Sequence, residues 1–349
     1  MKPLRIGDRS IGPGQPCFLI AEAGVNHNGS LDLALALVDA AAAAGAQAVK
    51  FQTFRAERLA TPGAPLAAYQ RRASRVGESQ QDLLRHLELS EEAHRALMAR
   101  CQQRGILFLS SPFDEESADF LEQLGVAAFK IPSGEINNLA FLAHVAGKGK
   151  PLIVSTGMSY LGEVEDAVRT IRSNSDRGFV LLHCVSNYPA AAEDVNLRAM
   201  QTMASAFGAP VGYSDHTLGV EIPLAAVALG ACVVEKHFTL DRSLPGPDHQ
   251  ASADPQELAS LVRGIRLVEA ALGHGRKEPT PREAETAATV RKSFTAARDI
   301  PHGSILTNEM IVLKRPGTGL PPASRSYLIG RRAKVDISAG TLLSLEMLS

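Results

Sequence analysis

The sequence predicts an α/β protein in which a (β/α)8 (TIM) barrel is followed by a small, mostly β domain. Eight short apolar runs recur along the chain, and a helix-like segment follows each of them. Continuous apolar runs without polar alternation are typical of strands buried on both faces, as in parallel sheets. Eight such pairs within about 270 residues match the size of a closed barrel. An open doubly wound sheet is the alternative, and the count of eight favours the barrel.

Each expected strand is an apolar run that ends in polar residues. The eight runs cover residues 17–22, 46–52, 106–110, 127–133, 152–156, 179–184, 210–215 and 231–237. Ser30, Ser90 and the pair Asp254-Pro255 suit helix N-termini, and a glycine follows each of these three segments. The expected helices cover residues 31–44, 91–105, 116–124, 139–146, 161–172, 196–206, 222–229 and 256–272.

The chain divides unequally. We expect the barrel over residues 1–274, a linker over 275–289, which is charged and contains proline, and a small domain over 290–349. This last part holds an internal repeat, because residues 299–310 align with 336–347 at a constant offset of 37, with six of twelve pairs identical. The repeat predicts a pseudo-twofold domain with glycine turns. A unit this small has little core of its own, so we expect it to pack on a barrel.

Composition excludes several classes of function. The chain has 36 Lys and Arg against 37 Asp and Glu, a net charge of −1, so it lacks the basic footprint of a nucleic-acid-binding protein. No apolar run reaches eighteen residues, which predicts no membrane span. Tryptophan is absent and aromatic residues make up 5% of the chain, so few side chains could stack on bases or sugars. The four cysteines show no CxxC spacing and predict buried free thiols in a reducing cytoplasm.

Two lysines are the sharpest signals for chemistry. Lys50 and Lys130 lie inside apolar runs near strand ends, where barrel enzymes place their active sites. An unpaired buried ammonium is costly, so each lysine needs a partner. An anionic phosphate or carboxylate ligand would serve, and it would make the pocket locally cationic in a neutral chain. The alternatives are an internal ion pair with Glu22 or Glu135, or a Schiff-base lysine.

Two histidines form the second signal. His216 and His237 lie at the tips of consecutive strands, which a barrel brings close together. Two imidazoles at this place could bind a divalent transition metal and leave positions open for oxygen ligands. The alternative is a hydrogen-bonding or acid–base role. The turn 246–249 would hold Asp248 above the barrel mouth.

Several motifs resemble one known family. They are IAEAGVNHNG at 20–29, KFQ at 50–52, FKIPSGE at 129–135, STGM at 155–158, YSDHT at 213–217, EKHFTLDR at 235–242 and KRPGTG at 314–319. Together they resemble the sialic acid synthases, which carry a C-terminal antifreeze-like (SAF, β-clip) domain. The resemblance implies a metal-dependent, aldol-type condensation of phosphoenolpyruvate with N-acetylmannosamine, giving N-acetylneuraminate and phosphate in nonulosonic acid biosynthesis. It also implies Mn²⁺ and a homodimer with swapped C-terminal domains.

The same resemblance implies roles for individual residues. Phosphoenolpyruvate would be bound by Lys50, Lys130, Ser133, Ser155, Asn187 and Ser214. The sugar would be bound by Gln52, Tyr188, Asp248 and, from the neighbouring subunit, Arg315. The metal would be held by His216 and His237. Besides Lys50 and Lys130, the catalytic candidates are Glu22 and Glu135, since a carboxylate is needed to take a proton from water.

Other functions stay open at this point. Legionaminic acid synthases use the same chemistry on 2,4-diacetamido-2,4,6-trideoxymannose, and the segment LPGPDHQ at 244–250 resembles both the sialic and the legionaminic branch. The pseudaminic branch usually departs from this pattern. In a different class, the chain would be a non-catalytic carbohydrate- or ice-binding protein with an inert barrel, and the strand-end lysines and histidines would be structural.

Overall fold

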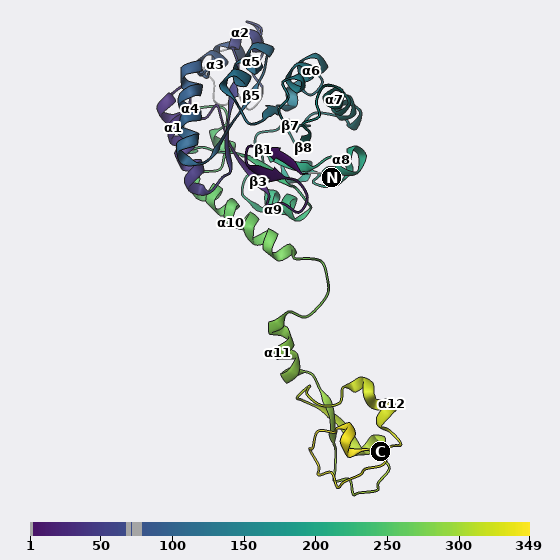
Figure 1. Ribbon diagram of the computed structural model, residues 1–349. Coiled ribbons are helices and arrows are strands. Elements are labelled where there is room, and N and C mark those ends of the chain that lie inside the picture. The colour runs from purple at the N-terminus through teal and green to yellow at the C-terminus, as the bar shows by residue number, and fades with distance from the viewer. Residues whose placement is uncertain (1–2, 68–70, 72–78) are drawn as a thin grey trace. The chain divides into compact units, whose positions relative to one another are not determined.

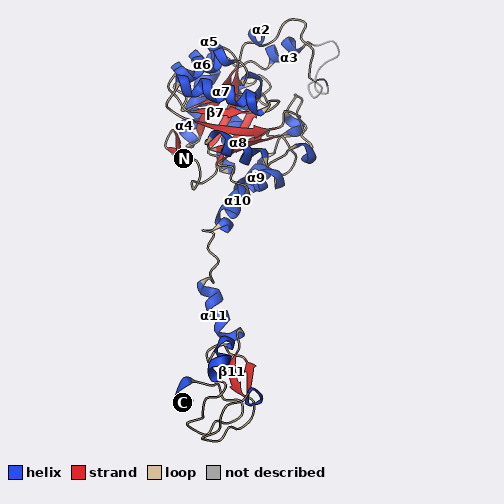
Figure 2. Cartoon of the chain, turned by 90° about the vertical axis from the view of Figure 1, so that its right-hand side faces the viewer, coloured by secondary structure: helices blue, strands red, loops and turns tan. Residues whose placement is uncertain are grey.

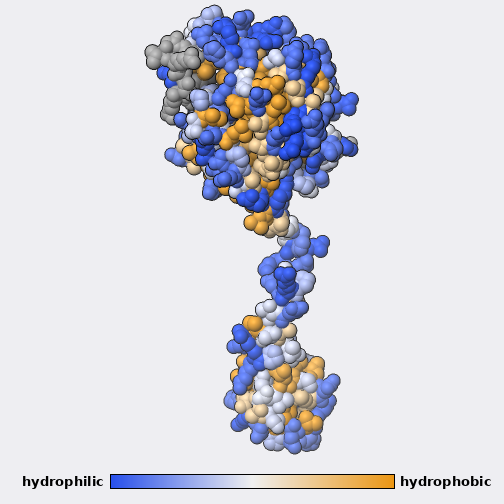
Figure 3. Space-filling view, turned by 90° about the vertical axis from the view of Figure 1, so that its left-hand side faces the viewer, coloured by the Kyte–Doolittle hydropathy of each residue, from blue (hydrophilic) through white to orange (hydrophobic). Residues whose placement is uncertain are grey.

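The computed structural model describes residues 3–67, 71 and 79–349, which form two compact units, 1–273 and 274–349 (Figure 1). No helix in these described ranges is long and apolar enough to cross a membrane. On the face drawn in Figure 3, hydrophilic side chains cover most of the first unit and surround an apolar area. The two units are described in turn.

The first unit is built on an eight-stranded parallel sheet. Its order is β5-β4-β3-β10-β9-β8-β7-β6, and the two end strands, β5 and β6, lie side by side, so the sheet forms a near-closed barrel. The strands are β3 (Phe18–Gly24), β4 (Ala48–Thr53), β5 (Leu107–Pro112), β6 (Phe129–Ile131), β7 (Leu152–Ser155), β8 (Phe179–Cys184), β9 (Val211–Asp215) and β10 (Val233–His237). The predicted barrel is confirmed.

Helices surround these strands, as Figure 2 shows in blue around red, and in the described residues eight of them form the outer layer of the barrel. They are α1 (Leu31–Ala44), α4 (Glu91–Arg104), α5 (Glu115–Leu124), α6 (Leu139–Gly147), α7 (Leu161–Asn174), α8 (Ala199–Phe207), α9 (Glu221–Ala228) and α10 (Pro255–Leu272). Local signals set their ends. The Ser30 hydroxyl accepts from the Leu33 amide, and Gly45 adopts φ 89° beyond the last turn of α1. Helix α8 starts three residues later than predicted, after a 3₁₀ turn over Ala192–Asp194.

A short hairpin at the start of the chain was not predicted. Strands β1 (Leu4–Ile6) and β2 (Arg9–Ile11) pair antiparallel. Leu4, Ile6 and Ile11 are buried against apolar side chains inside the barrel, among them Phe18 and Val233 at the beginnings of their strands. The hairpin therefore fills the amino-terminal end of the barrel. Runs of three residues are too short to produce a recognisable alternation pattern, which is why the sequence did not reveal it.

Between β4 and α4, the residues that the structure describes include two further helices. Helices α2 (Ala56–Leu59) and α3 (Gln80–His86) carry side chains of a separate apolar cluster. We call this group the α2–α3 cluster. Its buried members are Val25, Phe54, Ala56, Ala60, Leu83, Leu84 and Leu87, and Leu59 and Phe113 pack against it.

The second unit contains helix α11 (Pro281–Val290), the antiparallel strands β11 (Ser293–Ala296) and β12 (Ile311–Lys314), and helix α12 (Arg325–Leu328). Isolated β-bridges connect much of the remaining chain. Helix α11 occupies most of the second half of the segment 275–289 that we expected to be a linker. A capping box at Thr280 starts the helix, and none of its residues is buried.

Backbone pairing confirms the internal repeat in this unit. Ile300 and Ile337, which are 37 residues apart, exchange both backbone hydrogen bonds, at 2.8 and 2.9 Å. The Asp299 carboxylate accepts from the Ala339 amide and the Asp336 carboxylate accepts from the His302 amide, both at 2.7 Å. The two bonds are equivalent under the same offset, so the halves are related by a pseudo-twofold axis.

The β1–β2 hairpin, which plugs the amino-terminal end of the barrel, should contribute to stability through its buried side chains. We expect Ile6→Ala to lower the free energy of unfolding by about 2 to 4 kcal/mol, because the side chain is fully buried and its removal leaves a cavity. Arg5→Ala is the matched control, since Arg5 lies on the same strand and is exposed. Urea unfolding of both variants measures the difference. Equal midpoints for the two variants would contradict the plug.

Candidate active site

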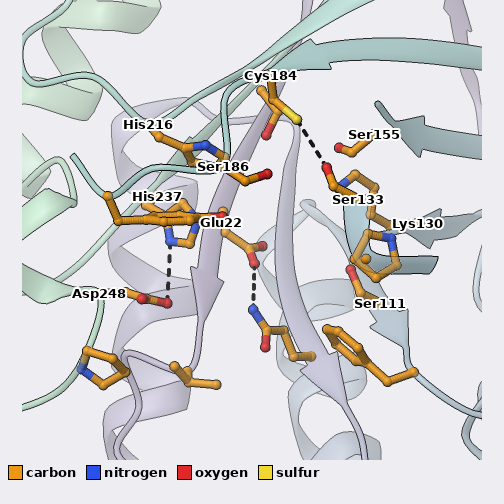
Figure 4. A pocket seen from close by; sticks show the side chains of 18 of the residues that line it. Glu22, Ser111, Lys130, Ser133, Ser155, Cys184, Ser186, His216, His237 and Asp248 are labelled. Carbon is orange, nitrogen blue, oxygen red and sulfur yellow. Dashed lines mark hydrogen bonds and ion pairs between the residues drawn. The ribbon is translucent and has the colours of Figure 1, made fainter. Parts of the chain in front are cut away.

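A cavity of about 440 Å³ lies at the carboxyl end of the barrel (Figure 4). Every strand of the barrel sheet contributes to it. The contributing side chains within the strands are Glu22, Lys50, Gln52, Ser111, Lys130, Ser155, Cys184, Ser214, Glu235 and His237. Rigid strands therefore fix the floor of the site, as in other barrel enzymes.

Four buried charges alternate across this floor. The Lys50 ammonium lies 2.7 Å from Glu22 Oε2 and donates to Ser111 Oγ at 3.2 Å. The Lys130 ammonium lies 3.1 Å from Glu235 Oε1, which also accepts from Ser214 Oγ at 3.0 Å and lies 3.8 Å from Lys50 Nζ. We call Glu22, Lys50, Glu235 and Lys130 the charge network.

The charge network decides between the predicted partners of the lysines. The ion pair of Lys50 with Glu22 is confirmed, but Lys130 pairs with Glu235 instead of Glu135. Carboxylates thus already balance the charges of both lysines. The expectation that the side chains of the pocket carry a net positive charge is wrong. Glu235 was given no role from the sequence. The signal was present, because Glu235 and His237 are two residues apart on β10 and so share one face of that strand.

Burial and neighbouring charges shift the pKa values of Glu22 and Glu235 in opposite directions. Burial raises the pKa of Glu22 to about 7, and this outweighs the opposing effect of Lys50. Burial also disfavours the charged form of Glu235, but Lys130 and Lys50 together outweigh it and lower its pKa to about 2. Glu22 can therefore exchange a proton near neutral pH while Glu235 stays ionised. Such a division of roles is typical of acid–base sites.

Hydroxyl groups line the cavity beside Lys130. Ser133, Ser155 and Ser214 lie there as predicted, and the buried Ser155 hydroxyl has no hydrogen-bond partner among the described residues. The structure does not bring Asn187 to them. In the loop after β8, Ser186 and Tyr188 line the cavity, whereas the side chain of Asn187 between them is exposed.

The structure also keeps Glu135 out of the cavity lining. Glu135 lies in a 3₁₀ turn, Ser133–Glu135, and its carboxylate accepts from the Asn138 side chain at 2.9 Å just before α6. Gln52, by contrast, donates to Glu22 Oε1 at 3.4 Å and lines the cavity. Glu22 is thus the candidate acid–base residue that the geometry supports.

The two histidines meet at one side of the cavity. Their ring centroids are 5.3 Å apart, and the ring of Tyr188 packs against both. His216 Nδ1 donates to the Val185 carbonyl at 2.6 Å, which leaves its Nε2 lone pair available. In the described part of the chain, the buried His237 Nδ1 has no hydrogen-bond partner, and it lies 3.8 Å from Asp248 Oδ2. Burial lowers the pKa of both histidines, which favours neutral rings.

This donor set fits a divalent cation with open positions. Two neutral imidazoles supply nitrogen ligands, and the buried Asp248, whose pKa burial raises to about 6, lies beside them. Within the described residues, no group of three or more His, Cys, Asp and Glu side chains is arranged to enclose a metal ion. A cation bound here would therefore complete its coordination with water or substrate oxygen atoms.

The remaining predicted residue, Arg315, lies in the second unit. It follows β12 directly, and its side chain is exposed.

Comparisons with known proteins place the chain in a family. The model of the NeuB family matches residues 37–277, and that of the SAF domain matches residues 291–349. The chain is 51% identical over 344 residues to N,N'-diacetyllegionaminic acid synthase of Legionella pneumophila, covering 97% of each protein. It is 47% identical to the enzyme of that name from Campylobacter jejuni, covering 93% of this chain and 98% of the relative.

A solved structure agrees. The crystal structure of N-acetylneuraminic acid (sialic acid) synthetase from Leptospira borgpetersenii superposes with a TM-score of 0.73 at 41% identity, covering 82% of this chain and 95% of the other. The relatives are sugar acid synthases, and their similarity extends over both units of this chain. The chain therefore belongs to the NeuB family of nonulosonic acid synthases and carries a C-terminal SAF domain.

Proposed function

We propose that this enzyme condenses phosphoenolpyruvate with the open-chain aldehyde of an N-acetylated, mannose-type aminosugar. The products are a nine-carbon 2-keto acid and inorganic phosphate. The observation that carries this proposal is the pair of buried lysines, Lys50 and Lys130, on a floor that also presents Ser133, Ser155 and Ser214. Ammonium and hydroxyl groups together can satisfy the oxygen atoms of a phosphate and a carboxylate.

The charge balance of the floor supports a requirement for a cation. Lys50 and Lys130 face three carboxylates, Glu22, Glu235 and Asp248, so the formal charge is −1 when all five are ionised. An anionic substrate must replace carboxylates as the partner of the lysines. Protonation of Glu22 removes one negative charge, and a divalent cation adds two positive ones. Protonation alone brings the formal charge to 0, whereas a divalent cation brings it to +1, so the cation is the change that makes the site attractive to phosphoenolpyruvate.

We propose that His216 and His237 hold this divalent cation, with Mn²⁺ as the first choice. When bound, it supplies a Lewis acid for the aldehyde oxygen and helps to orient the sugar. The protein's own contribution is to keep both imidazoles neutral and oriented. The Val185 carbonyl fixes the ring of His216, and Asp248 lies beside His237.

Glu22 is the proposed acid–base residue. Carbon 3 of the enol attacks the aldehyde carbon, water adds to carbon 2, and the resulting intermediate loses phosphate. The water must lose a proton to a neighbouring base. Glu22 is held from both sides, by Lys50 at Oε2 and by Gln52 at Oε1, and its pKa of about 7 suits proton transfer near neutral pH.

The acceptor proposed is the diacetamido trideoxy sugar, in preference to N-acetylmannosamine. One side of the cavity is an apolar wall from the α2–α3 cluster, formed by Val25, Leu59, Leu84, Leu87 and Phe113. The diacetamido sugar offers methyl groups at positions where N-acetylmannosamine offers hydroxyls, and buried apolar contact favours the methyl groups. The two relatives at 51% and 47% identity are named as legionaminic acid synthases, which supports the same choice. Gln52, Tyr188 and Asp248 are the proposed polar contacts.

We also propose a homodimer in which the second unit of one copy serves the barrel of the other through Arg315. The charges of the two units support it. Residues 1–273 carry 24 basic and 30 acidic residues, a net charge of −6, and residues 274–349 carry 12 and 7, a net charge of +5. Opposite charges favour association of a second unit with a barrel.

Phosphate release tests the reaction and the acceptor together. With phosphoenolpyruvate and Mn²⁺, we expect kcat/KM for 2,4-diacetamido-2,4,6-trideoxymannose to exceed that for N-acetylmannosamine at least tenfold, about 1.4 kcal/mol. Chelation should abolish release, and added Mn²⁺ should restore it. In the Leu59→Asn variant, which makes the wall polar, the ratio should fall. Preference for N-acetylmannosamine would overturn the acceptor assignment, and no release with either sugar would favour a binding protein.

The two candidate carboxylates predict opposite outcomes. We expect Glu22→Gln to lower kcat by about 10² to 10⁴, since a general base is lost. Glu135→Gln is the matched control and should stay within about twofold of the wild type, because Glu135 lies outside the cavity lining. Steady-state kinetics of both variants decides the matter. Loss of activity on changing Glu135 alone would reverse the assignment.

Complementation tests the swapped arrangement. Arg315→Ala should raise KM for the sugar, and Glu22→Gln should be inactive. When the two variants are co-expressed, random pairing joins an intact barrel to an intact Arg315 in about a quarter of the sites, so about a quarter of the wild-type activity should return. Purified homodimers of each variant are the controls. Activity no higher than the mean of these controls would show that Arg315 acts within its own chain.

A further inference from the structure

Two hydrogen-bond partners, the Gly157 amide and the Cys184 thiol, converge on the hydroxyl oxygen of Ser133. The Gly157 amide donates to Ser133 Oγ at 3.0 Å, and Cys184 Sγ lies 3.2 Å from the same oxygen (Figure 4). The three residues lie at the carboxyl ends of β6, β7 and β8, beside one another in the barrel. A serine hydroxyl has one proton to donate and two lone pairs to accept with. The Gly157 N–H donates to one lone pair of Ser133 Oγ. The Cys184 sulfur therefore either accepts the Ser133 hydroxyl proton or donates its own proton to the second lone pair.

Close packing keeps these groups in place. A Cβ atom added to Gly157 would lie 2.4 Å from Ser186 Oγ, 2.8 Å from Ser133 Oγ and 3.0 Å from Cys184 Sγ. A Cβ atom at residue 157 would therefore force Ser186 and Ser133 to shift, so glycine at this position preserves the close approach of its amide to Ser133. Cys184 is 4% exposed and lines the cavity. The thiol is therefore both buried and adjacent to the cavity.

We propose that Cys184 is a positioning residue that directs the hydroxyl proton of Ser133 toward the bound anion. The inference rests on the proposed function, in which phosphoenolpyruvate occupies this floor. In the empty cavity either Ser133 or Cys184 can donate to the other. An anionic oxygen beside Ser133 is the stronger acceptor, so it attracts the hydroxyl proton. The thiol then donates to the second lone pair of Ser133, and all three hydrogen bonds are satisfied at once.

This role makes a prediction that a simple packing role does not. We expect Cys184→Ala to raise the Kd for phosphoenolpyruvate and for inorganic phosphate about three- to tenfold, because the hydroxyl loses one of its two donors. Because Cys184 is not proposed to touch the sugar, KM for the acceptor and kcat should stay within about twofold. Cys184→Ser keeps an O–H donor and should recover most of the affinity. Calorimetric titration with each anion and steady-state kinetics measure these values.

Cys101→Ala is the matched control. Cys101 is also a buried free thiol, 1% exposed, but it lies on α4 and outside the cavity lining. Its removal should cost stability without changing either Kd. If Cys184→Ala binds both anions like the wild type, the proposal is overturned. If Cys184→Ser binds as weakly as Cys184→Ala, the thiol acts by its volume and the donor role is overturned.

The wild-type titrations separate this inference from the function on which it rests. Binding of phosphoenolpyruvate by the wild type, together with equal affinity in all variants, would remove Cys184 alone from the site. Failure of the wild type to bind either anion, in a preparation that releases no phosphate, would overturn the proposed function and this inference with it.

Discussion

The charge network is the constraint on which the rest of the site depends. Burial of an unpaired charge costs several kcal/mol, so each member is tolerable only next to a partner of opposite sign. Strand register supplies the partners. Glu22 is directly opposite Lys50 on β3 and β4, and Glu235 is opposite Ser214 on β10 and β9. A change of one residue in either register would turn these side chains away from the cavity and leave charges unpaired.

The network also explains how two lysines can be buried side by side at the proposed anion site. Burial, and to a lesser extent the charge of Lys50, lower the pKa of Lys130 even in the presence of Glu235, so two buried lysines without counter-charges would lose protons. The carboxylates hold the ammonium groups charged and in place until a ligand arrives. Glu22, with its pKa near 7, is the partner that can be neutralised by a proton, so release of Lys50 to the substrate costs less than release of Lys130 from Glu235.

The sequence predicts the framework better than the details of the site. Eight buried strands, helix caps and lysines within apolar runs are strong local signals, and they place Lys50, Lys130, Ser133, Ser155 and Ser214 on one floor. The sequence does not show which side chain of a loop faces the cavity, because this depends on how the loop turns in the folded protein. For this reason it did not predict that Ser186 lines the cavity while Asn187 is exposed. Glu235 was hard to identify for a second reason. Its neighbour Lys236 is also charged, but it points to the opposite face of the strand and forms an ion pair with Asp215. Because consecutive residues are both charged, the sequence does not show which of them faces the cavity.

Two kinds of structure line the cavity: the strands of the barrel, and the segment that carries α2 and α3. The groups proposed for anion binding and proton transfer belong mainly to strands or to the residues that directly follow them, whose positions the barrel fixes. Much of the apolar wall belongs to α2, α3 and their flanks, inserted between β4 and α4 outside the regular barrel pattern. Substitutions in that wall would leave the registers of the charge network untouched, so under the proposed function the acceptor could change while the anion-binding chemistry of the strands stayed the same. Under the proposed function, acceptor choice would therefore depend on the segment that carries α2 and α3, and the reaction type on the strands.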